Sequence, residues 1–196
     1  HYPMNLRVAF LCIAFASGSS LVAQTLETVI QKGHELAVLC VAVSADSNFV
    51  VTGSRDKSAK LWEAATGREV RSFLGHEASV TAVALSRDNQ WLLTGSNDQS
   101  IRLWDVQNGK SVFEKKTINY ITDVAIDPLQ RFFAVAGYNR SGYGDSVLIF
   151  EMTTQRLMTK IPADPDKGNA RGVDVAFSPD GQWLMLGEDN YTTRLF

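Results

Sequence analysis

The fold is decided by two consecutive stretches that repeat each other: residues 33–74, GHELAVLCVAVSADSNFVVTGSRDKSAKLWEAATGREVRSFL, and residues 75–116, GHEASVTAVALSRDNQWLLTGSNDQSIRLWDVQNGKSVFEKK. Aligned without a gap, the two stretches are identical at 17 of 42 positions. Unrelated sequences of this length would agree at only about two or three positions. The chain is therefore built on an internal repeat with a period of 42 residues.

Each repeat has the pattern of short β-strands. In the first unit, apolar or β-branched runs cover Val38–Val43, Phe49–Thr52, Ala59–Trp62 and Val70–Leu74. The first three runs are separated by the turn-forming segments Asp46–Asn48 and Ser54–Asp56. No segment carries a convincing amphipathic helical stripe. The sequence therefore predicts an all-β protein with four antiparallel strands in each unit.

The markers at the two ends of the unit identify a family resemblance. Each unit begins with Gly-His, and its third strand ends with Trp and an acidic residue, Trp62-Glu63 in the first unit and Trp104-Asp105 in the second. A four-stranded unit with these markers resembles the WD40 repeat, which implies a β-propeller of about four blades in residues 24–196. The resemblance places the repeats near residues 33–74, 75–116, 117–161 and 162–196, and the last two are less similar.

The sequence leaves two architectures open. Gln24–Lys32 aligns with the fourth-strand segments that precede each later unit. An outer strand, three full repeats and three final strands are enough for a closed four-bladed ring. WD40 propellers usually have about seven blades of about 42 residues each, so the alternative is a fragment of a larger propeller.

The first 23 residues have the features of an export signal. Arg7 precedes the apolar run Val8–Ala16, and small residues lead to an expected cleavage site after Ala23. The run is too short to cross a bilayer as a helix, which takes about 20 residues. We therefore expect a signal peptide at residues 1–23, no membrane span in the mature chain, and a periplasmic or secreted location. The alternative is a buried N-terminal helix.

An imidazole, a hydroxyl and a carboxylate recur at the same spacing in both units. A catalytic site is not expected to be duplicated in adjacent blades, so we interpret these residues as structural. The resemblance implies a buried tetrad in which carboxylate, imidazole, hydroxyl and indole are hydrogen bonded in that order. Its members are His34, Thr52, Asp56 and Trp62 in the first unit, and His76, Thr94, Asp98 and Trp104 in the second.

The third and fourth units lack this tetrad. The histidine and aspartate positions hold Thr117 and Gly144 in the third unit, and Gly168 and Asn190 in the fourth. The tryptophan positions hold Phe150 and Phe196. We expect these two blades to be softer, with the two phenylalanines packing where the indoles pack elsewhere. Cys40 is expected to be a small core residue, whereas Asp123 and Asp174, at the same strand position, are expected near a solvated strand end.

Nothing in the sequence indicates chemistry. It contains no glycine-rich phosphate loop, no Cys or His cluster with metal spacing, and no nucleophile with a base beside it. The net charge is −2, and no run of Lys or Arg could line a phosphate backbone. We therefore expect no catalytic residues, no cofactor, no metal and no nucleic-acid partner.

The remaining expectation is a binding scaffold. The resemblance implies a contact face made by residues just after Gly-His and just before the turn aspartate, namely Glu35, Ala37, Arg55, Glu77, Ser79 and Asn97. An enlarged loop from Tyr138 to Asp145, which contains Tyr143, is a further candidate contact. These side chains suit a protein or peptide partner. The alternative is the sensing or docking region of a larger exported enzyme, for example a peptidase, whose catalytic domain lies beyond Phe196.

Overall fold

The computed structural model describes residues 33–117, 120–138, 145–162, 172–188 and 193–196. Several sequence-based expectations lie outside the described residues and stay predictions. They are the signal peptide at residues 1–23, the outer strand at Gln24–Lys32, the contact residue Tyr143, and the positions Gly144, Gly168 and Asn190. A helix of the length and apolar character needed to cross a bilayer does not occur among the described residues.

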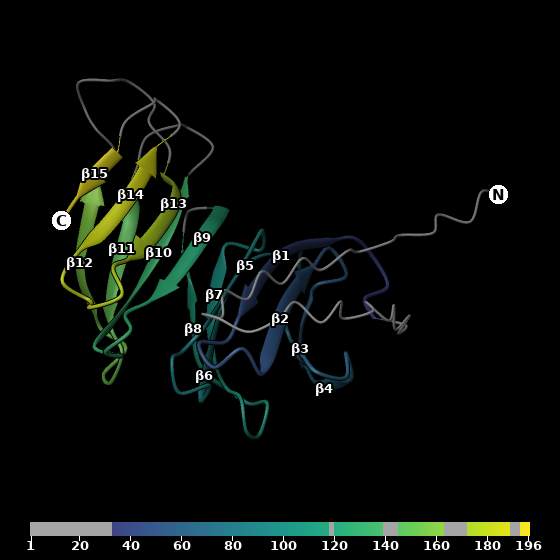
Figure 1. Cartoon of the computed structure of the whole chain (residues 1–196). Helices are drawn as coiled ribbons and strands as arrows, with labels where there is room; N and C mark the ends of the chain where they lie inside the picture. The colour runs from purple at the N-terminus through teal and green to yellow at the C-terminus, as the bar shows by residue number, and fades with distance from the viewer. Residues whose placement is uncertain (1–32, 118–119, 139–144, 163–171, 189–192) are drawn as a thin grey trace.

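The described chain folds into four antiparallel sheets, each built from strands that are neighbours in sequence (Figure 1). The first sheet contains β1 (Val38–Val43), β2 (Phe49–Ser54), β3 (Ser58–Glu63) and β4 (Glu69–Leu74). The second contains β5 (Val80–Leu85), β6 (Trp91–Ser96), β7 (Ser100–Asp105) and β8 (Ser111–Lys116). The predicted all-β class is confirmed, and the four strands predicted in the first unit agree with β1–β4 to within two residues at each end.

The two less similar units form sheets of the same kind. The third sheet contains β9 (Tyr120–Ile126), β10 (Phe132–Tyr138), β11 (Asp145–Glu151) and β12 (Leu157–Pro162). The fourth has three described strands, β13 (Gly172–Phe177), β14 (Leu184–Glu188) and β15 (Thr193–Leu195). The four-stranded blade expected of a WD40 propeller is therefore present in the first three units, and three strands of it are described in the fourth.

The same tight turn joins the first two strands of every sheet. In the first sheet, the Asp46 carboxylate accepts hydrogen bonds from the Ser44 hydroxyl (2.6 Å) and the Asn48 N–H (3.0 Å). The residue between them, Ser47, has a φ of 61°. Positive φ is tolerated best by Gly and Asn, and the positions with positive φ in these turns hold glycine or a polar residue. The equivalent positions with positive φ in the later sheets are Asn89, Gln130 and Gly181.

An apolar layer lies between each pair of neighbouring sheets. Strand alternation sends successive side chains to opposite faces, so Leu92 packs toward the first sheet and Leu93 toward the third. The sheets approach closely at Gly53, where a Cβ would lie 2.7 Å from a methyl carbon of Val80. Burial of both faces of the inner sheets stacks the blades and fixes the end of each strand relative to its neighbours.

The four sheets form an open arc. The first and fourth sheets lie at opposite ends of the array, with the second and third between them (Figure 1). No ring closure between β1–β4 and β13–β15 is therefore made by the described residues. The outer strand expected at Gln24–Lys32, on which closure of a four-bladed ring depends, lies outside the described residues, so both architectures stay predictions.

One position of the first strand holds Cys40 in the first sheet, Asp123 in the third and Asp174 in the fourth, and only Asp123 differs from expectation. Cys40 is half-buried and packs against the core between the first two sheets, as predicted, and burial raises the pKa of its thiol to about 12. Asp123, at the same position in the third sheet, is also half-buried instead of lying at a solvated strand end. Its carboxylate accepts a hydrogen bond of 2.9 Å from the N–H of Val175 in the fourth sheet. Asp174 is exposed.

Candidate interaction rim and its hydrogen-bonded support

The expected contact residues gather at one end of the first two sheets. Val38 pairs with Ser54 in the β1–β2 ladder, so the segments before β1 and after β2 lie at the same end. Val80 and Ser96 make the equivalent pair in the second sheet. We call this end the rim, defined by residues 33–37 and 55–57 of the first sheet and residues 75–79 and 97–99 of the second. The Asp46 and Asp88 turns lie at the opposite end.

A chain of side-chain hydrogen bonds lies just beneath the rim of the first sheet. His34 Nδ1 is 2.8 Å from Asp56 Oδ2, and His34 Nε2 is 2.7 Å from Thr52 Oγ1. The indole Nε1–H of Trp62 donates to the same Thr52 oxygen at 2.8 Å. These are the four side chains of the expected tetrad, in the expected order.

The second sheet repeats the arrangement almost unchanged. His76 Nδ1 is 2.9 Å from Asp98 Oδ2, and His76 Nε2 is 2.8 Å from Thr94 Oγ1. Trp104 Nε1–H donates to Thr94 at 2.9 Å. Because the ionised carboxylate can only accept, Nδ1–H donates to it, and in the neutral ring Nε2 then accepts from the threonine hydroxyl. Each buried polar group in the chain thus finds a partner, which is the condition for tolerating it there.

Each tetrad is joined by a serine that was not among the expected members. The Ser58 hydroxyl donates to Asp56 Oδ1 at 2.6 Å, and the Ser100 hydroxyl donates to Asp98 Oδ1, also at 2.6 Å. Both serines belong to the 17 identical positions of the two repeats, two residues after the tetrad aspartate. That shared spacing is the signal that could have identified them.

Hydrogen bonds hold both tetrad carboxylates in the ionised form. Burial alone would raise the pKa of Asp56, but hydrogen bonds from Ser58, the Glu35 N–H and His34 lower it to about 2. Burial also raises the pKa of Asp98, but hydrogen bonds from His76, Ser100 and the Glu77 N–H outweigh it and hold this pKa below that of Asp56. The carboxylates are therefore charged at neutral pH.

The tetrads also anchor the backbone of the rim. The N–H of Glu35 donates to Asp56 at 2.9 Å, and the N–H of Glu77 donates to Asp98 at 2.8 Å. Two further backbone bonds close the rim loops, from Arg55 N–H to the Ala37 carbonyl (2.8 Å) and from Asn97 N–H to the Ser79 carbonyl (3.0 Å). In each sheet, the rim backbone is thus held by one hydrogen bond to the tetrad carboxylate and by a second between its two segments.

The side chains of the expected contact residues point largely to solvent. Ser79 is half-buried, and the other five are exposed, namely Glu35, Ala37, Arg55, Glu77 and Asn97. Glu77 lies 3.8 Å from Lys116, but both side chains are mostly exposed, and such a pair contributes little. The rim of the first two sheets therefore presents a mixed polar surface.

The third and fourth sheets differ from this plan. Tyr138 is half-buried, with its ring centroid 5.8 Å from that of Tyr120. Phe150 is buried and stacks on Phe133 with ring centroids 5.0 Å apart, which agrees with the expected packing. The expectation for Phe196 is wrong: its side chain is 47% exposed, and its ring contacts the Arg194 guanidinium at 5.6 Å instead of entering a core. Met185 and Leu195, beside it in the same sheet, are exposed as well.

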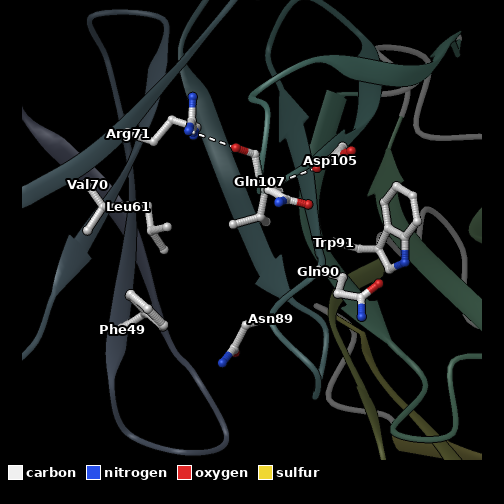
Figure 2. A pocket seen from close by; sticks show the side chains of 10 residues that line it. Phe49, Leu61, Val70, Arg71, Asn89, Gln90, Trp91, Asp105 and Gln107 are labelled. Carbon is white, nitrogen blue, oxygen red and sulfur yellow. Dashed lines mark hydrogen bonds between the residues drawn. The ribbon is translucent and has the colours of Figure 1, made fainter.

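A groove of about 500 Å³ lies between the first two sheets, away from the rim. Apolar residues line much of it, namely Phe49, Leu61, Val70 and Trp91, and Arg71 reaches across it to the Gln107 carbonyl at 2.8 Å (Figure 2). None of the expected contact residues lines this groove. Among the described residues, no three His, Cys, Asp or Glu side chains are gathered closely enough to hold a metal ion.

Comparisons with known proteins agree with the repeat architecture. The family described as WD domain, G-beta repeat, matches residues 24–63 and residues 67–105. The chain is also similar to a protein named ribosome biogenesis protein BOP1 homolog from Drosophila ananassae, with 42% identity over 48 residues. The same identity and length relate it to ribosome biogenesis protein bop1-A from Xenopus laevis. These matches span 24% of this chain and only 6% and 7% of the two relatives.

Three features therefore agree. The 42-residue unit, the four-stranded sheets and the two family matches all describe the same building block. Both matches end at the Trp and acidic residue of a third strand, at Glu63 and at Asp105. Residues 24–63 and 67–105 are therefore WD40 repeats, and the described sheets have the architecture of WD40 β-propeller blades.

Proposed function

We propose that this chain is a non-catalytic interaction scaffold that binds a protein or peptide through the rim of its first two sheets. The observation that carries the proposal is the support beneath that rim. The tetrad carboxylates of Asp56 and Asp98 hold the backbone of Glu35 and Glu77 in place while the side chains stay exposed. A surface that is already ordered loses little conformational entropy when a partner binds.

The chemistry of the rim suits a polar polypeptide. It combines acidic side chains, the cationic side chains of Arg55 and Lys57, an asparagine, small residues and the exposed Leu36, which together can pair with backbone amides and with charges of both signs. A net charge of −2 and the lack of any run of Lys or Arg favour a polypeptide over a nucleic acid. We therefore propose a protein or peptide partner with a mixed-charge contact segment.

Peptide display tests the proposal because the selection itself supplies the binding sequences. Peptides are selected on the immobilised chain from a random library, and their dissociation constants are measured for the wild type and for Arg55→Ala and Glu77→Ala. At least one of the two changes is expected to weaken the selected peptides by about tenfold or more. Matched controls are Arg87→Ala, in the turn at the opposite end, and Glu114→Ala, on β8; both residues are exposed.

The controls decide the outcome. If Arg87→Ala and Glu114→Ala weaken the peptides as much as the rim changes do, the contact surface is elsewhere and the rim proposal is wrong. The same conclusion follows if neither rim change alters binding. Circular-dichroism melting of each variant separates loss of contact from loss of fold, because exposed side chains of this kind seldom change stability by more than about 0.5 kcal/mol.

A further inference from the structure

The arc ends in an apolar face at each side. In the first sheet, Val41 is 56% exposed, and Val38, Leu39 and Val43 around it on β1 are exposed as well. In the fourth sheet, Met185 is 51% exposed, together with Trp183 and Leu195. Contiguous exposed apolar side chains on a folded chain mark surfaces that associate with something.

The face of the first sheet is one half of an interface that the chain forms internally. Val38 and Val41 stand 42 residues before Val80 and Val83. Those two valines are buried in the core between the first and second sheets, on the side that faces the preceding sheet. Val38 and Val41 thus present to solvent the surface that, one repeat later, packs against a neighbouring blade.

The face of the fourth sheet is the other half. Met185 pairs with Ala176 in the β13–β14 ladder, as Ala134 pairs with Ala125 in the β9–β10 ladder. Ala134 is buried against the following sheet, where it joins the core that contains Leu184. Met185 therefore occupies the position that faces the next blade, and it faces solvent instead.

The fourth sheet also exposes the equivalent of the polar group that makes a hydrogen bond between the third and fourth sheets. Across the third and fourth sheets, the Asp123 carboxylate accepts a hydrogen bond from the Val175 N–H. Asp174 holds the position of Asp123 in the fourth sheet and is exposed, while Val41 holds the position of Val175 in the first. A blade that docked on the fourth sheet with the geometry of the internal interfaces would offer Asp174 an N–H from the Val41 position.

We propose that a second copy of this chain docks head to tail, with the fourth-sheet face of one copy against the first-sheet face of the other. One chain carries both complementary halves of an interface that it forms three times internally, so a second copy offers each face the surface that it fits. Head-to-tail contacts close into a ring when the rotation permits. Two copies with four sheets each make eight, which lies within the roughly 4–8 blades of known propellers.

The test measures the mass of the full 196-residue chain by light scattering over a concentration series. A two-copy species is expected for the wild type. Val41→Asp and Met185→Asp are each expected to shift the chain to the monomer, because a charge cannot be buried unpaired in the apolar contact. The matched controls Val112→Asp and Met158→Asp change residues of β8 and β12 that are 42% and 56% exposed, and both are expected to leave the two-copy species intact.

Mixing the two variants tests the head-to-tail geometry itself. A copy with Val41→Asp retains an intact fourth sheet, which can dock on the intact first sheet of a copy with Met185→Asp. The mixture is therefore expected to recover a two-copy species that neither variant forms alone. Contacts between two identical faces would give no such recovery. A monomeric wild type, a mixture that stays monomeric, or controls that dissociate as readily as the test variants would each overturn the proposal.

Discussion

The second and third sheets fill the same space with different chemistry. At two equivalent positions the second sheet has Thr94 and Trp104, and the third has Val135 and Phe150. All four side chains are buried. In the second sheet they belong to a hydrogen-bonded tetrad, whereas Phe150 in the third stacks on Phe133. A polar network and an aromatic stack thus support the same blade geometry.

The comparison shows that the hydrogen-bonded side chains of such a network are replaced together by apolar side chains. Removing one partner from a buried hydrogen bond leaves the other unsatisfied, but replacing both partners by apolar groups of similar shape is nearly neutral. The third sheet has lost both the hydroxyl and the indole, so neither is left without its partner. Thr117, at the histidine position, makes a different bond and donates to the Gln99 carbonyl at 3.1 Å.

The largest expected effect is on the aromatic side of the comparison. Phe150→Ala removes a fully buried ring that contacts Phe133 and Phe113, and should lower the free energy of unfolding by about 3–5 kcal/mol. Phe196→Ala, at the equivalent position of the fourth sheet, should cost less than about 1 kcal/mol because its ring is half exposed. Urea unfolding of the two variants measures both values. Equal losses would mean that the Phe196 ring is buried in a core as the Phe150 ring is, and would contradict the comparison.

The next effect tests whether the tetrad acts as a network. His76→Ala leaves the Asp98 carboxylate and the Thr94 hydroxyl without their shared partner, and should lower stability by about 3 kcal/mol. Combined with Asp98→Ala, the loss should be smaller than the sum of the two single losses by at least about 1 kcal/mol. A double-mutant cycle in urea provides the measurement. Additive losses would show that the four side chains contribute independently.

The comparison also shows which parts of the structure the sequence could predict. The repeat placed β1–β4 and the tetrad spacing correctly, because a pattern that occurs twice separates shared constraints from chance. The same logic could have added Ser58 and Ser100. Asp123 and Phe196 were misplaced because their surroundings come from neighbouring sheets: Val175 supplies the N–H that permits a half-buried carboxylate, and no described sheet covers Phe196. Contacts between blades are not encoded within one repeat.

Exchanging threonine and valine at one equivalent position of the second and third sheets tests whether the network can be changed only as a whole. Thr94→Val takes the hydroxyl away from His76 and Trp104, and Val135→Thr buries a hydroxyl among apolar neighbours in the third sheet. Although each change makes one sheet resemble the other, both should lower stability, by about 1–3 kcal/mol. Thermal unfolding of the two variants is sufficient. A neutral Thr94→Val would mean that the hydroxyl is dispensable within the tetrad.

The smallest effect is the pH dependence, and it should have opposite signs on the two sides of the comparison. The lowered pKa of Asp98 means that its stabilising contribution is present above the unfolded value near 3.8 and is lost as the pH falls toward its folded value. Burial raises the pKa of Asp123, partly offset by the Val175 N–H, so its charge opposes folding at neutral pH and this penalty disappears as the pH falls.

Urea unfolding from about pH 6 to about pH 3 separates the two carboxylates. Asp98→Asn should flatten the loss of stability in acid, because the group that must be protonated is gone. Asp123→Asn should steepen that loss, because the variant no longer gains stability when the buried carboxylate is neutralised. If the two variants changed the profile in the same direction, the hydrogen bond from Val175 would outweigh the burial of Asp123, and the contact between the third and fourth sheets would resemble the tetrads in its response to acid.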